Sequence, residues 1–382
     1  MAWSAHKTDD QLREFCADEV TLKEQAKQLA DLINQSKHVV VFTGAGISTS
    51  SGIPDFRGPQ GVWTMEAKGL ACTSAVDTEQ AIPTPAHMAL VALEKQNKLH
   101  YLISQNCDGL HRRSGFPATK LSELHGNFNV EVCRSCGKEY LRDFDCEAED
   151  RHGIPEHRTD RKCACGHYLY DTIVNFGEDL PKVALDRAYD QSNQADLFIV
   201  LGSSLTVTPA NDMPKCAKKR GAKLVICNLQ KTPMDKKCDL RVFGRTDQLM
   251  ELTLWHLSIE SYPWILKRYV KIMMTKTPAM IQIEAVELDG TAVTVFSQVK
   301  LQASHPTKAQ SRRQEPFKFQ LKLPKSTEPQ LLTATLSFMG HYGEPKLQMC
   351  IKWTGEASKT MYELVFDPRK GAWDVPIERV LL

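Results

Sequence analysis

The chain has no long apolar run and little net charge. A membrane-spanning helix needs about 18 consecutive apolar residues, and no stretch of the chain approaches that length. The first residues, MAWSAHK, lack the apolar core of a secretion signal. Membrane insertion and secretion are therefore not expected. The content of 42% hydrophobic and 25% charged residues is that of an ordinary soluble protein, and the formal net charge of +2 indicates no particular partner.

A dense disulfide scaffold is also missing. Twelve cysteines among 382 residues are too few for one, and several of them fall in closely spaced pairs. Such spacing in a chain without a secretion signal favours metal ligands and free thiols over disulfides.

The chain lacks the complete glycine pattern of hydride-transferring dinucleotide enzymes. An apolar run, Val39 to Phe42, reads as a buried strand that ends in Gly44-Ala45-Gly46, but Thr49 stands where a third glycine is expected. A strand followed by such a turn and a helix start can present backbone N–H groups to a diphosphate, and Ser48 or Thr49 can bind phosphate or cap the helix. A generic turn is an equally good reading of these residues alone. We expect a bound nucleotide without hydride transfer.

Three further apolar runs end in polar or small residues. Residues 195–201 lead into Gly202-Ser203-Ser204, residues 223–227 lead into Asn228-Leu229-Gln230, and the run before Gln105 leads into Asn106-Cys107-Asp108. Strands that alternate with helices predict an α/β fold with a doubly wound, Rossmann-like parallel sheet. Ligands bind such sheets in the crevice at the carboxyl ends of the strands.

The pattern predicts four regions. We expect an N-terminal helical segment over 1–36 and a catalytic domain over 37–265, into which a small cysteine-containing module of about 126–176 is inserted. Beyond residue 270 the apolar residues alternate, and Asp289-Gly290 separates two such runs as in a hairpin. Residues 275–382 are therefore predicted to form a separate all-β domain, whose role the sequence does not reveal.

Eight ordered features between about Leu12 and Trp264 resemble one family. Besides two cysteine pairs of zinc-binding type, the motifs are GAGIS, PDFRG, QNCDGLH, ELHGN, NFGEDLP, LGSSL and CNLQ. Together they resemble the sirtuins, NAD-dependent protein deacylases, and most closely the nuclear class IV branch, the type of mammalian sirtuins six and seven. The resemblance does not reach the predicted β domain.

The resemblance implies a catalytic set of Asn106, Asp108 and His125. A lone histidine is more often structural, but the ELHGN context implies that His125 deprotonates a ribose hydroxyl of NAD, a role that suits its pKa near about 6.5. Asn106 would orient the nicotinamide ribose and a water, and Asp108 would bind the nicotinamide carboxamide. The acyl group of a modified lysine would pass to ADP-ribose as nicotinamide leaves, without a protein nucleophile.

The resemblance also implies binding residues. NAD would contact the residues of the glycine turn, the PDFRG loop and the ends of the later strands. These are Gly44, Ala45, Gly46, Ser48, Thr49, Asp55, Phe56, Arg57, Trp63, Gln105, His125, Gly202, Ser203, Ser204, Asn228, Leu229, Gln230 and Thr246. For Phe56 and Trp63 taken alone, core packing is the commoner reading. Val174, Asn175, Phe176, Gly177 and Glu178 match the strand along which the family binds substrate backbone.

Two cysteine pairs predict one structural zinc ion. Cys133-x2-Cys136 and Cys163-x-Cys165 offer four thiolates, the ligand set of a closed tetrahedral site. The second pair departs from the commoner spacing because only one residue separates its cysteines. The fallback ligands are Cys146, His152, His157 and His167, and a redox dithiol is the weaker alternative.

Three functions compete at this point. The first is a deacylase of histones or other nuclear proteins, with a nuclear location and possible chromatin association implied by the class IV resemblance. The second is a mono-ADP-ribosyltransferase or a preference for long acyl chains. The third is a non-catalytic NAD-sensing chromatin scaffold, against which the intact Asn106, Asp108 and His125 argue.

Overall fold

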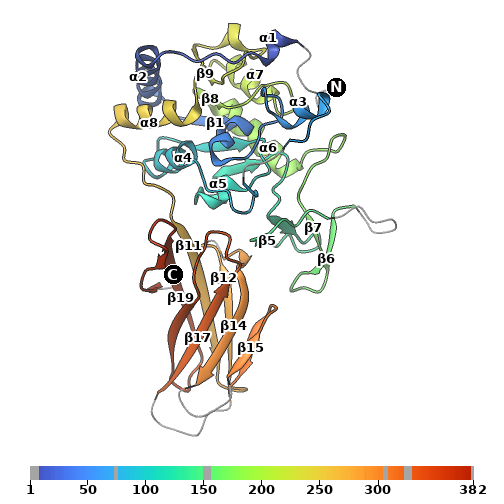
Figure 1. Ribbon diagram of the computed structural model, residues 1–382, viewed down its shortest axis with the longest axis vertical. Helices are drawn as coiled ribbons and strands as arrows, with labels where there is room; N and C mark the ends of the chain where they lie inside the picture. The colour runs from blue at the N-terminus through green and yellow to red at the C-terminus, as the bar shows by residue number, and fades with distance from the viewer. Residues whose placement is uncertain are drawn as a thin grey trace. The chain divides into compact units, whose positions relative to one another are not determined.

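The computed structural model describes residues 8–72, 76–148, 156–288, 290–303, 309–321 and 329–379. The chain divides into two compact units (Figure 1). Unit 1 combines Met1–Phe128 with Thr172–Trp264, and unit 2 combines Asn129–Asp171 with Ile265–Leu382. The expected cysteine module and the expected C-terminal β region therefore lie in one unit, although the 93 residues of Thr172–Trp264 in unit 1 separate them in the sequence.

Unit 1 is built on a six-stranded parallel sheet with the order β10-β9-β8-β1-β2-β3. Its strands are β1 (Val39–Thr43), β2 (Tyr101–Ser104), β3 (Leu121–Glu123), β8 (Leu197–Leu201), β9 (Lys223–Cys227) and β10 (Leu240–Val242). All five residues of β1 and of β8 are buried, as expected for strands covered on both faces. The predicted doubly wound α/β fold is confirmed.

Helices cover both faces of this sheet. They are α1 (Asp9–Leu12), α2 (Glu19–Gln35), α3 (Val62–Ala67), α4 (Pro85–Lys95), α5 (Leu110–Arg113), α6 (Lys182–Gln194), α7 (Asp212–Lys219) and α8 (Thr246–Leu257). Val39 and Val41 of β1 pack in one core with α2, α4 and α8. Val40 and Phe42 pack on the opposite face with α6 and α7, because successive strand residues point to opposite faces. Among the described residues, no helix has the length and apolar character needed to cross a membrane.

Short 3₁₀ turns replace the helix expected behind β1. They are η1 (Ala45–Ile47) and η2 (Thr49–Ser51), with η3 (Ala118–Lys120) and η4 (Asp235–Lys237) elsewhere in unit 1. The N–H groups of Ile47 and Ser48 donate to the carbonyls of Gly44 and Ala45 within this turn. The expectation of a helix N-terminus at this loop is therefore wrong, because the turn uses these donors internally.

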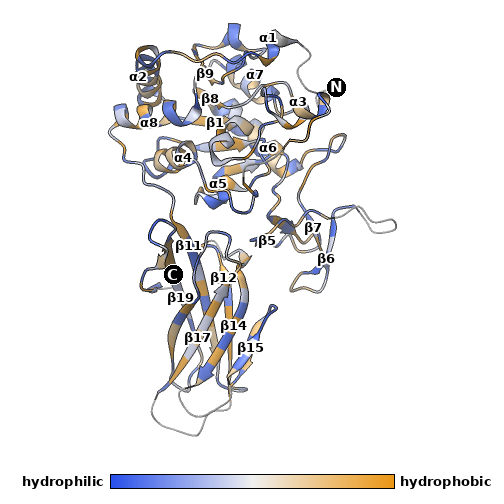
Figure 2. Ribbon diagram, in the orientation of Figure 1, coloured by the Kyte–Doolittle hydropathy of each residue, from blue (hydrophilic) through white to orange (hydrophobic). Residues whose placement is uncertain are grey.

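The described residues of unit 2 form two sheets of mostly antiparallel strands. The larger sheet has eleven strands along the path β20-β19-β11-β12-β13-β5-β4-β7-β6, with β16 beside β12 and β21 beside β19. The smaller sheet has the order β15-β14-β17-β18. Their buried residues share one core, and Figure 2 shows hydrophilic and hydrophobic positions alternating along these strands.

Strands of unit 2 occur in the region beyond residue 270, where alternating runs were predicted, and within the cysteine module, where no strand was predicted. They are β4 (Val130–Val132), β5 (Glu139–Arg142), β6 (Arg158–Lys162), β7 (Tyr168–Asp171), β11 (Leu266–Thr275), β12 (Met280–Val286), β13 (Ala292–Thr294), β14 (Phe296–Ala303), β15 (Gln310–Arg312), β16 (Phe317–Gln320), β17 (Gln330–Phe338), β18 (Leu347–Trp353), β19 (Ser358–Asp367), β20 (Ala372–Trp373) and β21 (Ile377–Arg379). The predicted hairpin is confirmed, because β12 and β13 pair antiparallel through Ala285 and Val293. Strand β11 pairs with both β12 and β19, and no strand was predicted over its residues.

One parallel pairing joins the cysteine module to the C-terminal strands. Strand β13 pairs with β5 so that Ala292 lies opposite Tyr140 and Thr294 lies opposite Arg142. In the adjacent strand β4, Glu131 pairs with Tyr140. The nine strands of this path therefore form one continuous sheet drawn from two distant parts of the chain.

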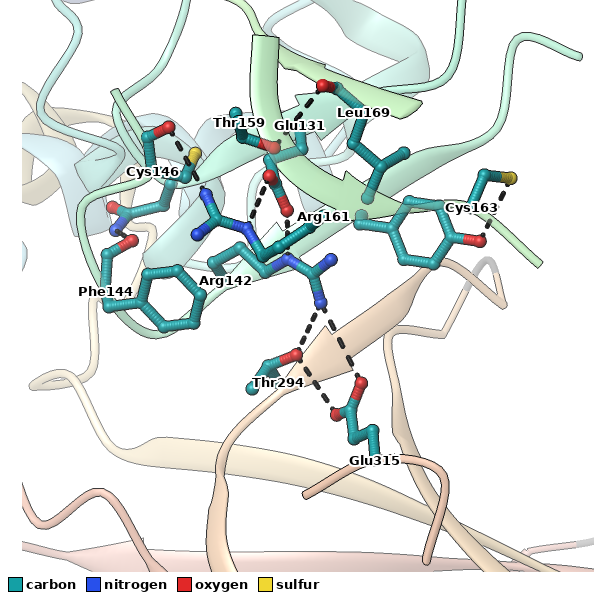
Figure 3. Close-up of polar contacts among 12 residues, drawn as sticks. Glu131, Arg142, Phe144, Cys146, Thr159, Arg161, Cys163, Leu169, Thr294 and Glu315 are labelled. Carbon is teal, nitrogen blue, oxygen red and sulfur yellow. Dashed lines mark hydrogen bonds and ion pairs between the residues drawn. The ribbon is translucent and has the colours of Figure 1, made fainter. Parts of the chain in front are cut away.

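An ionic network crosses this joint (Figure 3). Arg142 Nε donates to Glu131 Oε2 at 2.5 Å, and Arg142 Nη1 donates to Thr294 Oγ1 at 2.6 Å. Arg161 Nε donates to the other Glu131 oxygen at 2.6 Å, and Glu315 lies 3.9 Å from Arg142. The Glu131 side chain is fully buried. A buried carboxylate is tolerated only when charged partners satisfy it, so these arginines hold the joint in one arrangement.

Candidate functional site

The parallel sheet of unit 1 reverses its winding between β1 and β8. Chain order runs outward from β1 through β2 to β3 on one side, and through β8 and β9 to β10 on the other. Ligands of such sheets bind at this reversal, beyond the carboxyl ends of the strands. Two cavities of about 330 and 500 Å³ lie there, and their walls share Gly46, Asp55, Gly202 and Gln230 among other residues.

Three glycines let the loops after β1 and β8 approach closely. A Cβ atom on Gly44 would lie 2.8 Å from the Gly202 carbonyl oxygen, and one on Gly202 would lie 2.6 Å from the Gly46 carbonyl carbon. Gly202 also has a φ of +67°, a conformation that other residues rarely adopt. The Gly46 N–H donates to the Gly202 carbonyl at 2.9 Å. The two loops therefore form one rigid floor under the cavities.

Asn106 and Asp108 are buried at the end of β2 and are tied to the loop after β1. Asn106 Nδ2 donates to the Gly44 carbonyl at 3.2 Å and to Ser48 Oγ at 3.3 Å. Ser48 Oγ donates to Asp108 Oδ2 at 2.6 Å, and the Leu110 N–H donates to Asp108 Oδ1 at 2.9 Å. These bonds fix both side chains in the wall of the first cavity.

His125 is held as a single tautomer. Its Nδ1 lies 2.8 Å from the Gln105 carbonyl oxygen, which can only accept, so Nδ1 carries the proton and Nε2 keeps a lone pair. Burial lowers the pKa of His125, and the bond to Gln105 opposes that shift. The imidazole therefore lines the first cavity as a neutral base.

Gly126 and Gln105 fix the surroundings of this histidine. A Cβ atom on Gly126 would lie 1.8 Å from the Thr172 carbonyl oxygen, so only glycine fits directly behind His125. Gln105 Oε1 accepts a hydrogen bond from Ser203 Oγ at 2.6 Å, which ties the end of β2 to the loop after β8. The polar residues predicted after three different strands are thereby brought together.

An aromatic group forms another wall of the first cavity. The Trp63 ring lies 4.8 Å from that of Phe56 and 5.6 Å from that of Phe176, and the Arg57 guanidinium lies 4.3 Å above Trp63. Burial lowers the pKa of Arg57 to about 10, while Asp55 opposes that shift. Phe56 and Phe176 are 46% and 60% exposed, so a ligand in the cavity could cover them.

Residues 174–178 form a turn rather than a strand. The Glu178 N–H donates to the Asn175 carbonyl, the Asn175 N–H donates to the Glu178 carboxylate at 2.7 Å, and Gly177 has a φ of +99°. The Val174 N–H donates to the His125 carbonyl at 3.1 Å. All five residues still line the first cavity.

The remaining predicted binding residues line one or both cavities. The first cavity is lined by Ala45 and Ser204, the second by Thr49, Leu229 and Thr246, and both by Asn228 and Gln230. Sequence reasoning missed several residues of the second cavity, including Glu14, Arg245 and Asp247. Glu14 comes from far upstream of the glycine turn, and no local motif marks it.

The four predicted cysteines form one cluster in unit 2. The sulfur atoms of Cys133, Cys136, Cys163 and Cys165 all lie within 4.8 Å of one another. Cys133 and Cys165 are 3.5 Å apart, and Cys136 lies 3.6 Å from both Cys163 and Cys165. Four thiolates about 2.3 Å from a tetrahedral zinc would be about 3.8 Å apart, so this donor set fits zinc.

Two glycines shape both cysteine pairs in the same way. Gly137 follows the first pair with a φ of +72° and donates its N–H to the Cys133 carbonyl, and Gly166 follows the second pair with a φ of +88° and donates to the Cys163 carbonyl. The short C-x-C spacing therefore still makes a tight turn. Tyr140 Oη donates to Cys163 Sγ at 3.3 Å.

The fallback ligands lie in different settings. His157 Nδ1 is 2.9 Å from Asp171, and burial raises the pKa of the Cys146 thiol to about 12. His167 Nδ1 lies 3.5 Å from Cys165 Sγ, whereas His152 lies outside the described residues. The cluster found among the described residues contains the four predicted cysteines and none of these alternatives.

Comparison with known proteins places the chain in a family. A model described as "Sir2 family" matches residues 65–209. The chain is 37% identical over 242 residues to an NAD-dependent protein deacetylase of Sulfurisphaera tokodaii, an alignment that covers 59% of this chain and 93% of the relative. The chain belongs to the Sir2 family. The sirtuin resemblance predicted from the motifs is confirmed.

Two longer Sir2 relatives are more similar in sequence. The SRT1 deacetylase of Oryza sativa is 46% identical over 254 residues, which are 66% of this chain and 52% of the relative. Human sirtuin-7 is 43% identical over 256 residues, which are 65% of this chain and 63% of the relative. The matched part of this Sir2 chain thus spans about half to under two thirds of the length of these relatives.

Proposed function

We propose that this protein is an NAD-dependent protein-lysine deacylase. The observation that carries the proposal is His125, a neutral base whose Nδ1 proton is committed to Gln105 and whose ring lines a cavity with Asn106 and Asp108. General base catalysis needs a group of this kind within reach of the proton that it removes. Three relatives named as NAD-dependent protein deacetylases, from rice, human and Sulfurisphaera, support the same activity.

NAD fits the two cavities of unit 1. The floor made by Gly44, Gly46 and Gly202 admits a closely approaching diphosphate because no Cβ atom intervenes. The first cavity would take the nicotinamide half, between the aromatic wall and Asn106, and the second would take the adenosine half, beside Asn228 and Gln230. When bound, NAD supplies an electrophilic ribose carbon as its nicotinamide leaves.

The residues around that carbon have distinct roles. Asn106 and Asp108 are fixed by Ser48 and Gly44, and they orient the ribose and the carboxamide respectively. His125 accepts the proton of a ribose hydroxyl at Nε2 while Nδ1 remains bonded to Gln105. Catalysis then rests on positioning and on one base, without a covalent protein intermediate.

The substrate is an acyl-lysine side chain of another protein. Residues 174–178 form part of the first cavity wall, where a substrate backbone could pair with them after the turn opens. Histones or other nuclear proteins, chromatin association and a nuclear location are part of this proposal, because the resemblance to the class IV branch implies them. The four-cysteine cluster is proposed to bind one structural zinc ion.

A mass-spectrometric assay tests the activity. Purified protein is incubated with NAD and a panel of acyl-lysine histone peptides, and His125→Tyr is compared with wild type and with His256→Tyr, a matched change on α8 outside both cavities. We expect acyl-ADP-ribose and free lysine from wild type and His256→Tyr only.

Other outcomes would point elsewhere. ADP-ribose attached to protein without deacylation would favour the transferase. NAD binding without turnover on any peptide would favour the scaffold. Full NAD consumption by His125→Tyr would contradict the assignment of the base.

A further inference from the structure

A segment that precedes the sheet contributes one residue to the wall of the second cavity. This segment, residues 12–17, is called the N-terminal strap. Its Phe15 N–H donates to the Leu229 carbonyl at 2.8 Å, and its Ala17 N–H donates to the Phe243 carbonyl at 2.7 Å. These bonds fix the strap directly after Glu14, and Glu14 is the strap residue that lines the cavity.

Strand β9 offers no carboxylate to a ligand in this cavity. Nucleotide sites of parallel sheets commonly bind ribose hydroxyls through an acidic side chain near the end of a neighbouring strand. Here β9 is followed by Asn228, Leu229 and Gln230. The Gln230 amide nitrogen is already committed, because it donates to the carbonyls of Leu12 and Arg57 at 3.2 Å each.

The other acidic residues of the cavity are engaged by the fold. Asp247 accepts hydrogen bonds from the Ala86 N–H at 2.9 Å and from Ser50 Oγ at 2.5 Å, and Asp55 accepts one from the Gly58 N–H at 2.7 Å. Within the described part of the chain, no hydrogen bond engages the Glu14 carboxylate. Glu14 is therefore the carboxylate of this cavity that remains available to a ligand.

Glu14 has one carboxylate, Asp55, and one guanidinium, Arg245, as charged neighbours. Partial burial and then the nearby Asp55 carboxylate raise the pKa of Glu14, while Arg245 opposes the shift. A ligand that donates hydrogen bonds would relieve this crowding, whereas a further anion would increase it.

We propose that Glu14 accepts hydrogen bonds from the vicinal hydroxyls of the adenosine ribose in the second cavity and excludes a ribose that carries a 2′-phosphate. This inference rests on the proposed NAD-dependent function. The N-terminal strap thereby contributes the acidic side chain that is missing from the residues directly after β9. A 2′-phosphate would remove one of the donors and place a dianion against Glu14 and Asp55, so the same residue gives affinity and selectivity.

Binding of NAD and NADP to the full chain tests this role. Titration calorimetry compares wild type, Glu14→Gln, Glu14→Asp and a matched control, Glu24→Gln, which changes an exposed carboxylate of α2 outside the cavity. We expect Glu14→Gln to weaken NAD binding about tenfold and to reduce the preference for NAD over NADP by about tenfold or more. Glu14→Asp should retain the preference because it keeps the charge, and Glu24→Gln should bind as wild type does.

The outcomes separate this inference from the proposed function. Unchanged NAD affinity and selectivity in Glu14→Gln, with strong NAD binding by wild type, would overturn the role of Glu14 alone. Absence of NAD binding by wild type would overturn the proposed function and this inference with it. Equal melting temperatures of the variants establish that a loss of binding does not reflect unfolding.

Discussion

Units 1 and 2 place their polar residues in different ways. In unit 1 the polar side chains follow buried parallel strands, and Asn106, Asp108 and His125 are each fixed by a hydrogen bond while still lining a cavity. In unit 2 the strongest polar contacts are internal, and Glu131 is fully buried between two arginines. The same chain thus uses one sheet to present polar groups to a cavity and the other to join distant segments.

This difference predicts separable effects. Changes at the strand ends of unit 1 should alter binding and turnover more than stability, because those side chains face a cavity. Changes at the joint of unit 2 should alter stability more than turnover, since each charge there satisfies a buried partner.

Metal removal is expected to cause the largest loss of stability, and this loss should be confined to unit 2. Structural zinc contributes roughly 10–16 kcal/mol in small zinc-finger peptides, and here Tyr140 of β5 bonds directly to Cys163. Treating the zinc-loaded protein with a chelator should remove hydrogen-exchange protection from β4, β5 and β7, and also from β13, which pairs with β5. Protection of β1 and β8 should persist. Retained protection of β13 would show that the joint is independent of the metal.

The next largest loss of stability is expected from Glu131→Gln. It leaves Arg142 and Arg161 buried or half-buried without their shared counter-charge, at a cost of about 3–5 kcal/mol in unfolding free energy. Urea unfolding measures the loss. Asp160→Asn is the control, because the pair of Asp160 with Arg158 is more exposed and should contribute about 0–1 kcal/mol. Equal costs for the two variants would remove the distinction between buried and exposed pairs.

A smaller effect is expected from Gly202→Ala in unit 1. The added Cβ would meet the backbone of Gly46 at 2.6 Å, whereas the same change at Gly221 meets nothing within 4 Å, and both glycines have positive φ. The overlap should cost about 1–3 kcal/mol more at Gly202 than at Gly221. Urea unfolding of the two variants checks this, together with NAD binding, which only Gly202→Ala should weaken. A Gly221→Ala variant that is the less stable of the two would argue against a rigid floor.

The smallest expected effect is a shift in the pH profile. Burial lowers the pKa of His125 because it disfavours the charged imidazolium. The residue must be neutral to accept a proton, so activity should persist as pH falls to about 6.5, the ordinary value, and decline only below it. The check is to measure turnover from pH 5 to 8, with melting temperatures as a control. If activity were half lost at a pH above the ordinary histidine pKa, the prediction would be contradicted.

Local patterns predicted unit 1 well. The apolar runs that became β1, β8 and β9 are continuous, and the residues that follow each run are the ones that line the cavities. The family resemblance assigned His125 and Gln105 to one NAD site, where His125 Nδ1 lies 2.8 Å from the Gln105 carbonyl oxygen, and the cysteine spacing predicted the four-cysteine cluster. These features are predictable because each depends on a few neighbouring residues and on a known strand-end geometry.

Other features depend on distant pairing, which no local pattern encodes. Strand β11 was missed because Lys267, Arg268 and Lys271 interrupt its apolar alternation. The β5–β13 pairing and the Arg142 network join distant segments, and nothing in the sequence of either segment indicates its partner. The turns at 45–51 and 174–178 differ from the expected helix start and strand because internal hydrogen bonds satisfy them locally.

The β5–β13 pairing also affects how the protein is made. Arg142 ends β5 and Ala292 begins β13, so the 149 residues between them must leave the ribosome before the two strands can pair. At typical synthesis rates the edge of β5 then waits about 8–30 s for its partner. An open strand edge is a site where chains aggregate. During translation the edge of β5 that pairs with β13 therefore stays open until the C-terminal strands arrive.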